Sequence, residues 1–429
     1  MQVSTTPDSF SHAQRINIKD NLTEFPQSLY EAADTLEILD LSGNKLSSLP
    51  DDFHRFQNLK ILFLSDNNFE SFPEVLARCP ALTMVGFKAN RIKYIPEYAL
   101  PEYIRWLILT DNKITQLPKS FGRHQQLQKL MLAGNAITKL PDSMAMCRNL
   151  ELCRLSANQL ESLPDWIITL PRLSWLAFAG NPCCPSQAAE QNLEEIHWDE
   201  LQISHELGSG ASGIISKALW KERFDVALKA FRGDITSDGM PEDEMAISIA
   251  AGEHKNLVDV VGKLTGHPEN KDGLLLSLIA DDFVNLAGPP SLSSCTRDTY
   301  AEGQTFSLEH VLHIISAIAS VSAHLHDKAI IHGDLYGHNI LINPQADCIL
   351  GDFGAATQYT SLNQTMQHGL EQLEVRAFGC LLEELIDRVD STEPSESLNQ
   401  LKLLATRCLQ ENVNQRPLFN EISELVTSV

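Results

Sequence analysis

Residues 39–50 read LDLSGNKLSSLP, and variants of this phrase recur through the first part of the chain. The asparagine of each copy falls on a fixed pitch: every step is 23 residues, except one step of 22. A sequence period of this length predicts a solenoid, in which each repeat packs on its neighbours. The asparagines that mark the series are Asn21, Asn44, Asn67, Asn90, Asn112, Asn135, Asn158 and Asn181.

The phrase resembles a leucine-rich repeat, and this resemblance implies an α/β solenoid over residues 1–185. Each repeat would supply a short strand, the asparagine and a turn that often ends in Leu-Pro. We expect the leucines to form the core and the asparagine side chains to bond backbone groups at the bend, as a ladder. We expect no catalytic role for either residue type. The pattern ends at the sequence NPCCP, residues 181–185.

The outward-facing strand positions of the repeats are rich in apolar side chains. The solvated face of a sheet is usually polar, so an apolar face predicts a contact with a protein partner. The alternative is that the rest of the chain covers this face. The candidate partner-binding residues on this concave face are Ile61, Phe63, Met84, Trp106, Ile108, Met131 and Trp175.

A glycine-rich stretch opens the second half of the chain. Small residues between two strands let backbone N–H groups approach phosphates, although a plain hairpin can carry the same spacing. The next predicted strand, residues 226–229, ends in Lys229, which could neutralise nucleotide phosphates. The stretch has GxGxxG spacing followed by a β-branched residue, at Gly208, Gly210, Gly213 and Ile215.

Residues 330–342 read IIHGDLYGHNILI, and GDFG follows at residues 351–354. Asn339 lies five residues after Asp334, and Asp352 lies eighteen after it. Phosphoryl transfer requires a carboxylate near the acceptor hydroxyl and oxygen ligands for a metal ion. Each residue alone could belong to a turn, but the set, after a glycine loop and a strand lysine, is specific.

From about Trp198 the chain resembles a protein kinase, and as a whole it resembles the bacterial leucine-rich repeat-containing protein kinase family. The resemblance implies an α+β two-lobed kinase fold over residues 198–429, with a small lobe at 198–279 and a large lobe at 280–429. Residues 186–197 would be a linker or a capping helix. The implied activity is ATP- and Mg²⁺-dependent phosphorylation of serine or threonine.

Residue roles follow from the same resemblance. Lys229 and Asp334 would be catalytic, and Asn339 and Asp352 would bind Mg²⁺. The partner of Lys229 would be Glu244, with Glu242 as the alternative. The nucleotide-binding residues would be Gly208, Gly210, Gly213, Ile215, Lys229, Glu244, Ile279 and Ala280.

Four features depart from the family pattern. Gly333 replaces an arginine, and Tyr336 replaces a lysine that contacts the transferred phosphate, so His338 is a candidate for the missing charge. The segment after Asp352 is short and has no Ala-Pro-Glu motif. Glu374 stands where the resemblance expects an aspartate at the start of the central large-lobe helix. A nucleotide-binding pseudokinase scaffold therefore remains an alternative. A small-molecule kinase is another, because His-Gly-Asp at residues 332–334 also resembles aminoglycoside and choline kinases.

Size and composition set further bounds. A chain of 429 residues predicts two or three domains. The net charge of −23 argues against a nucleic-acid partner and against an anionic membrane surface. The nine cysteines have no metal-binding spacing, which favours free thiols in a reducing cytoplasm. The absence of an 18-residue apolar run and the polar N-terminus predict neither a membrane span nor a secretory signal.

Overall fold

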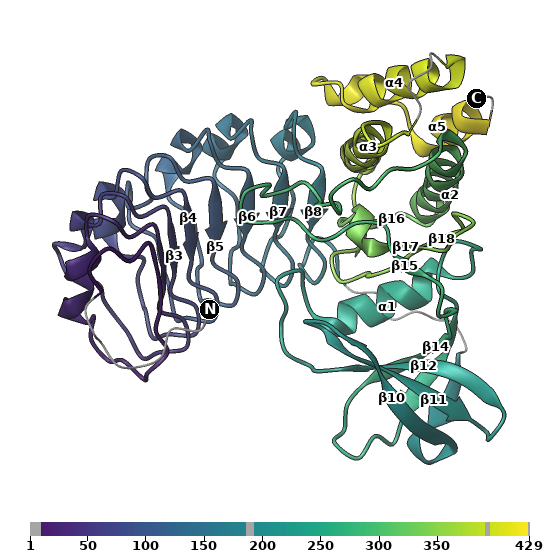
Figure 1. The fold of residues 1–429 in the computed structure, drawn as a ribbon, viewed down its shortest axis with the longest axis horizontal. Helices are drawn as coiled ribbons and strands as arrows, with labels where there is room; N and C mark the ends of the chain where they lie inside the picture. Colours follow the sequence, from purple (N-terminus) through teal and green to yellow (C-terminus); the bar gives the residue numbers. More distant parts are fainter. Residues whose placement is uncertain (1–9, 186–192, 391–394, 428–429) are drawn as a thin grey trace. The chain divides into compact units, whose positions relative to one another are not determined.

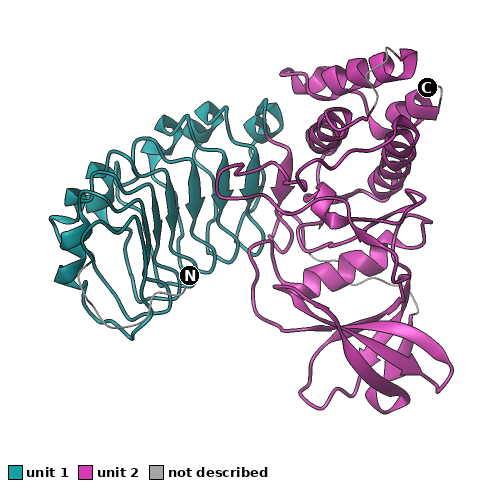
Figure 2. Ribbon diagram, in the orientation of Figure 1, with its two compact units in different colours: residues 1–172 teal, residues 173–429 magenta. Residues whose placement is uncertain are grey.

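The computed structural model describes residues 10–185, 193–390 and 395–427. The chain forms two units, Met1–Arg172 and Leu173–Val429 (Figure 2). The repeat sequence continues to residue 185, so the last repeat belongs to the second unit rather than the first. This division differs from the boundary expected from the sequence period alone.

The first unit is a solenoid of short parallel strands (Figure 1). From β1 to β7, each strand pairs with the strand of the next repeat. The strands are β1 (Arg15–Asn17), β2 (Ile38–Asp40), β3 (Ile61–Phe63), β4 (Met84–Gly86), β5 (Trp106–Ile108), β6 (Lys129–Met131) and β7 (Leu152–Arg154).

Short 3-10 helices connect the strands. Five of them follow a proline, whose fixed φ ends the extended segment before the helical turn. The Leu-Pro element of the repeat, or its Phe-Pro variant, therefore marks where most of these connectors begin. The 3-10 helices are η1 (Gln27–Ala32), η2 (Phe53–Arg55), η3 (Glu74–Arg78), η4 (Lys119–Arg123), η5 (Asp142–Met146) and η6 (Asp165–Thr169).

The asparagine ladder predicted from the repeat is confirmed. Asn67 Oδ1 accepts from the Leu46 amide at 2.8 Å, and its Nδ2 donates to the carbonyls of Leu41 and Leu64. One side chain thus links two consecutive repeats and satisfies backbone groups that the short strands leave unpaired. Asn44, Asn90, Asn112, Asn135 and Asn158 make equivalent bonds.

The second unit begins with strand β8 (Trp175–Ala177), followed by a six-stranded sheet in the order β10-β11-β12-β14-β13-β9. The predicted strand that carries Lys229 lies within β12. Helix α1 (Pro241–Ala251) carries Glu244. The sheet strands, with one 3-10 helix, are β9 (Glu194–His197), η7 (Trp198–Glu200), β10 (Leu201–Ser209), β11 (Gly213–Trp220), β12 (Phe224–Phe231), β13 (Val260–Thr265) and β14 (Gly273–Ser277).

The expected linker or capping helix over residues 186–197 is only partly observable. Residues 186–192 lie outside the described residues. Glu194–His197 forms strand β9, which pairs in parallel with β13, so these four residues are not helical. Ile196 of this strand is fully buried in the core of the sheet, which explains why an extended conformation is favoured.

The remainder of the second unit is mainly helical. Helices α2, α3 and α5 share a core in which the rings of Phe378 and Phe419 pack edge to face at 5.5 Å. The predicted strands at 340–342 and 348–350 form the hairpin β17–β18. The elements are β15 (Val284–Asn285), α2 (Leu308–Asp327), β16 (Ile330–Ile331), η8 (Gly337–Asn339), β17 (Ile340–Ile342), β18 (Cys348–Leu350), β19 (Thr357–Gln358), α3 (Gln364–Ile386), α4 (Glu396–Cys408), η9 (Val413–Gln415) and α5 (Phe419–Thr427).

Helix α2 is the one described helix that is long and apolar enough to cross a membrane. Half of its apolar window is nevertheless buried inside the protein. Its fully buried residues include Ile314, Ile318 and Val321. This burial is what a core helix of a folded domain requires.

Candidate active site

A cavity of about 620 Å³ lies between the β10–β11 hairpin, helix α1 and the β17–β18 hairpin. Residues far apart in the sequence meet in its wall. Strand β12 carries Lys229, Asn339 lies just before the β17–β18 hairpin, and Asp352 lies just after it. The predicted site residues in this wall are Gly208, Gly210, Ile215, Lys229, Glu244, Ile279, Ala280, Asn339 and Asp352.

Lys229 and Glu244 form an ion pair in this wall. Their side chains are 15% and 3% exposed. Burial raises the pKa of Glu244, Lys229 opposes this shift, and the nearby charge of Asp352 adds to it. The alternative partner, Glu242, is exposed on the same helix. The orientation of the helix therefore makes Glu244, and not Glu242, the partner of Lys229. The ion pair keeps the Lys229 ammonium group in the wall of the cavity.

The glycines of the β10–β11 hairpin have two different roles. A Cβ added at Gly208 or Gly210 would meet nothing within 4 Å, so the packing of the chain does not require glycine at either position. A Cβ at Gly213 would lie 2.5 Å from the carbonyl oxygen of Ala230. Gly213 is therefore required by the close approach of β11 and β12, and it is not among the residues that line the cavity. Its expected role over the phosphates stays a prediction.

Asp334 is held by its neighbours in the loop between β16 and η8. Asn339 Nδ2 donates to the Asp334 carboxylate at 2.8 Å and to its carbonyl oxygen at 2.9 Å. The buried ring of His332 accepts from the Asp334 amide through Nδ1 and donates to the Gly351 carbonyl through Nε2. These bonds tie the Asp334 loop to the residue before Asp352.

Asp352 adopts a left-handed backbone conformation with φ of +57°. Its Oδ1 accepts from the Gly354 amide at 3.1 Å. A non-glycine residue in this region is uncommon, and it persists only where the surrounding structure holds it. The turn brings the Asp352 carboxylate to the same cavity as Asn339.

The donor atoms fit the Mg²⁺–nucleotide complex that a kinase fold implies. Asp352 and Asn339 offer carboxylate and amide oxygens, the hard ligands that Mg²⁺ prefers. The described residues contain no cluster of three or more His, Cys, Asp or Glu that could hold a metal by itself. Mg²⁺ in such sites keeps waters and substrate phosphates in its shell, so two protein ligands are sufficient.

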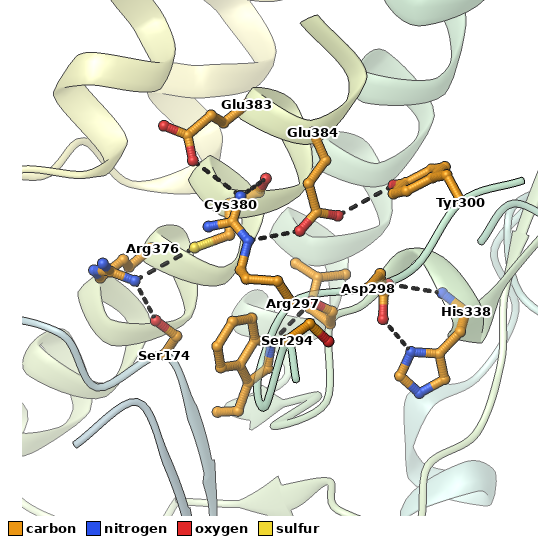
Figure 3. A network of polar contacts seen from close by, with 12 residues as sticks. Ser174, Ser294, Arg297, Asp298, Tyr300, His338, Arg376, Cys380, Glu383 and Glu384 are labelled. Atoms are coloured by element: carbon orange, nitrogen blue, oxygen red, sulfur yellow. Dashed lines mark hydrogen bonds and ion pairs between the residues drawn. The ribbon is translucent and has the colours of Figure 1, made fainter. Parts of the chain in front are cut away.

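His338, which also lines the cavity, is held by Asp298, a residue that no sequence motif indicates. Its ring Nδ1 and its backbone amide both bond the carboxylate of Asp298, at 2.7 and 3.1 Å (Figure 3). Burial opposes a positive charge on the ring, but the bond to Asp298 and the charges of Asp334 and Asp352 raise the pKa of His338 overall. The carboxylate of Asp298 is fully buried.

The segment that supplies Asp298 is anchored to α3. Arg297 bonds Glu384 at 2.7 Å and Glu383 at 2.9 Å, and the Tyr300 hydroxyl donates to Glu384 at 3.1 Å (Figure 3). Residues 281–306, to which the sequence assigned no role, therefore brace the His338 side of the cavity. These partners lie 40 to 87 residues apart, and no motif signals such a pairing.

Glu374 does not lie at the start of the central helix, contrary to the expectation. Helix α3 begins at Gln364, ten residues earlier. The Glu374 carboxylate is buried, accepts from the Gly333 amide at 2.7 Å and pairs with His326 at 2.8 Å. Burial alone would raise its pKa, but His326, His332 and the Gly333 amide lower it overall. Glu374 therefore supports the loop of Asp334 from within the helix.

Trp175 requires a further correction. It was expected on a free partner-binding face, but only 1% of it is exposed, and its indole stacks on Tyr336. For this residue the alternative, in which the rest of the chain covers the face, is the observed arrangement. Met84 and Met131 are also buried. The partly exposed members of the set are Ile61, Phe63, Trp106 and Ile108.

Comparison with known families agrees with this geometry. Residues 201–379 match the family described as protein tyrosine and serine/threonine kinase. Residues 34–92, 102–160 and 125–182 match leucine-rich repeats. The chain contains leucine-rich repeats followed by a protein kinase domain. The kinase match includes the glycine hairpin, Lys229, Glu244, Asp334, Asn339 and Asp352.

Individual relatives of the kinase domain are distant. The chain is 23% identical to fibroblast growth factor receptor 1 of Xenopus laevis over 311 residues, covering 58% of this chain and 37% of the relative. It is 24% identical to a probable cyclin-dependent serine/threonine-protein kinase of Dictyostelium discoideum, covering 53% and 37%. It is 24% identical to human protein-tyrosine kinase 6, covering 54% and 58%. The chain thus spans less than two thirds of the length of each of these relatives.

Proposed function

We propose that this chain is an ATP- and Mg²⁺-dependent serine/threonine protein kinase. The observation that carries the proposal is the convergence of Lys229, Glu244, Asn339 and Asp352 on one cavity, with Asp334 bonded directly to Asn339. A pseudokinase scaffold typically lacks one of these groups. Their joint presence supports an active phosphotransferase.

The residues divide the work of phosphoryl transfer. Bound ATP–Mg²⁺ supplies the phosphoryl group and part of the charge neutralisation. Lys229, kept in place by Glu244, would hold the phosphates under the hairpin of Gly208 and Gly210. Asp334 would orient the acceptor hydroxyl and take its proton. Because Asn339 donates through Nδ2 to Asp334, its amide oxygen is the atom suited to the metal.

The proposal also specifies which amino acid of the substrate receives the phosphate. The kinase relatives include proteins named for serine/threonine and for tyrosine phosphorylation. The resemblance of the whole chain to repeat-bearing kinases supports serine and threonine. Identification of the phosphorylated amino acid decides between these classes, and phosphotyrosine as the product would contradict this assignment.

We also propose that the repeats dock a protein partner or substrate. The partly exposed side chains Ile61, Phe63, Trp106 and Ile108 form the apolar strand surface that supports this role. The nine cysteines are free thiols, which supports a cytoplasmic location. Alanine substitution of Phe63 and Trp106 should weaken binding of the protein partner to the repeats without changing phosphoryl transfer to casein.

The experiment that tests the activity uses the full chain with Mg²⁺ and ATP labelled at the γ-phosphate. Transfer of label to the chain or to casein as a generic acceptor, on serine or threonine, supports the proposal. Nucleotide binding without transfer to any acceptor would favour the pseudokinase alternative. Transfer to an aminoglycoside or choline, but not to protein, would favour the small-molecule kinase.

A further inference from the structure

Trp175 of β8 packs against the two residues that follow Asp334. Its indole stacks on the Tyr336 ring with centroids 4.3 Å apart and ring planes 6° from parallel. Its Nε1 donates to the Leu335 carbonyl at 3.1 Å. The two aromatic side chains are 1% and 4% exposed. A buried stack combined with a buried hydrogen bond fixes both a side chain and a peptide group of this loop.

The residue before Asp334 also contacts this strand. Gly333 has φ of +70°, and a Cβ placed there would lie 2.8 Å from the Leu176 carbonyl oxygen and 2.6 Å from that of Ala355. The backbone of β8 therefore passes at a distance that only glycine allows. Asp334 is thus held between two positions, 333 and 335–336, that both contact the last repeat.

The last repeat also fixes the segment 353–363, which follows Asp352. The Thr357 hydroxyl accepts from the Phe178 amide at 3.2 Å, and Thr357 is fully buried. The Ser361 hydroxyl donates to the Cys183 carbonyl at 2.6 Å. This segment lacks the Ala-Pro-Glu motif expected of a kinase, and the repeat provides it with fixed contacts.

A third contact reaches the central helix. Arg376 of α3 donates to the Ser174 hydroxyl at 3.0 Å and also bonds the sulfur of Cys380 (Figure 3). Ser174 is 2% exposed. Contacts to the Asp334 loop, the following segment and α3 make the last repeat an integral part of this unit, as the unit boundary at Leu173 also indicates.

We propose that the last repeat, residues 173–185, is part of the catalytic apparatus, with Trp175 as the positioning residue that sets Asp334 through Leu335 and Tyr336. The inference rests on the proposed phosphoryl transfer. A contact that is only structural would change stability alone. A positioning contact would slow turnover while leaving the affinity for ATP unchanged, because Trp175 does not line the nucleotide cavity.

The test compares Trp175→Phe and Trp175→Ala with a matched control in the full chain. Phenylalanine keeps an aromatic ring and removes the N–H donor, whereas alanine removes both interactions. The control is Trp220→Phe, because Trp220 of β11 is also buried, and its indole donates to Glu200 of η7 at 3.3 Å. Steady-state transfer to casein gives kcat and KM for ATP, and amide hydrogen exchange follows residues 330–340.

For Trp175→Ala we expect kcat to fall by about 30-fold or more, and for Trp175→Phe by about threefold, since small displacements of a catalytic group cost large factors in rate. The KM for ATP should stay within about twofold. Amide hydrogen exchange in residues 330–340 should accelerate about tenfold in Trp175→Ala. Trp220→Phe should change neither kcat nor this exchange rate.

Wild-type kcat in both Trp175 variants would overturn the inference, whatever happens to hydrogen exchange or to the melting temperature. If Trp175→Ala does not fold, Trp175→Phe decides by the same readout. If the wild-type chain transfers no phosphate, the proposed function fails. In that case exchange alone decides, because faster exchange confined to residues 330–340 supports positioning by Trp175 and unchanged exchange contradicts it.

Discussion

At the scale of single residues, the identity of residue 333 follows from what surrounds it. Gly333 combines a left-handed backbone with two carbonyl oxygens closer than 3 Å to the position of a Cβ. The departure from the expected arginine is therefore a consequence of the strand packed against it. The amide of the same residue donates to Glu374, which further limits how the loop can shift.

We predict that Gly333→Ala destabilises the second unit by at least about 3 kcal/mol, from a left-handed alanine plus the steric clash. Gly303→Ala is the matched control, since Gly303 has φ of +73° but nothing within 4 Å of its Cβ position. It should cost only about 1 kcal/mol. Chemical denaturation of both variants measures the difference, and equal costs would show that Gly333 is not sterically constrained.

A second residue-scale prediction concerns Asp243 on α1. Burial, with a smaller contribution from Glu242, raises the pKa of Asp243 from 3.8 to about 6. The folded state thus disfavours the ionised carboxylate, so the wild type loses stability as pH rises from about 4 through about 6. Relative to wild type, Asp243→Asn should gain up to about 3 kcal/mol between pH 4 and pH 8. Denaturant unfolding at both pH values measures this gain, and a difference that does not vary with pH would refute it.

At the scale of elements, the asparagine ladder replaces the hydrogen bonds that three-residue strands cannot make. Asn112 Oδ1 accepts from the Ile92 amide, and its Nδ2 donates to the Phe87 and Leu109 carbonyls. Removing the side chain would leave these groups buried without a partner. The ladder therefore contributes to the cohesion of each pair of repeats.

We predict that Asn112→Ala costs about 2–4 kcal/mol of local stability in the first unit. Asn58→Ala is the control, because Asn58 also donates to the preceding repeat, at the Asp34 carbonyl, but is exposed. It should cost less than about 0.5 kcal/mol. Hydrogen exchange of strands β4 to β6 reports the cost of Asn112→Ala, and exchange of strands β2 and β3 reports the cost of Asn58→Ala. An equal loss of protection in the two variants would show that the ladder is not a source of stability.

The elements show what the sequence could and could not predict. The repeat period, the strand that carries Lys229 and the two strands that precede Asp352 were predictable, because local patterns determine them. The start of α3 was not predictable in this way. The resemblance placed Glu374 at the helix start, whereas the helix begins after its N-cap residue, Asn363. The Asp298–His338 pair and the Trp175–Tyr336 stack join residues 40 and 161 positions apart, and only tertiary packing brings them together.

At the scale of the whole molecule, the sequence period and the structural units end at different residues. The repeats read as one series to residue 185, yet the second unit begins at Leu173. Two elements upstream of Trp198 belong to this unit, namely β8 and the sheet strand β9. A kinase fragment designed from the sequence boundary alone would omit both.

We therefore predict that fragment 173–429 unfolds cooperatively, whereas fragment 198–429 has a melting temperature at least about 8 °C lower or does not fold. Losing β9 exposes the core around Ile196, and losing β8 exposes Tyr336 and Thr357, which together cost several kcal/mol. Calorimetry of both fragments measures this difference. Equal melting temperatures would mean that the unit is complete without residues 173–197.

The central claim is that Asp334 works with Lys229, Asn339 and Asp352 in phosphoryl transfer. Single-turnover transfer from γ-labelled ATP with Mg²⁺, alongside the nucleotide dissociation constant, tests it most directly in the wild-type chain and in Asp334→Asn. We expect the transfer rate to fall by about 100-fold or more, as for loss of a general base, while the dissociation constant changes by less than about threefold. Transfer at the wild-type rate in Asp334→Asn would contradict the assignment of the active site.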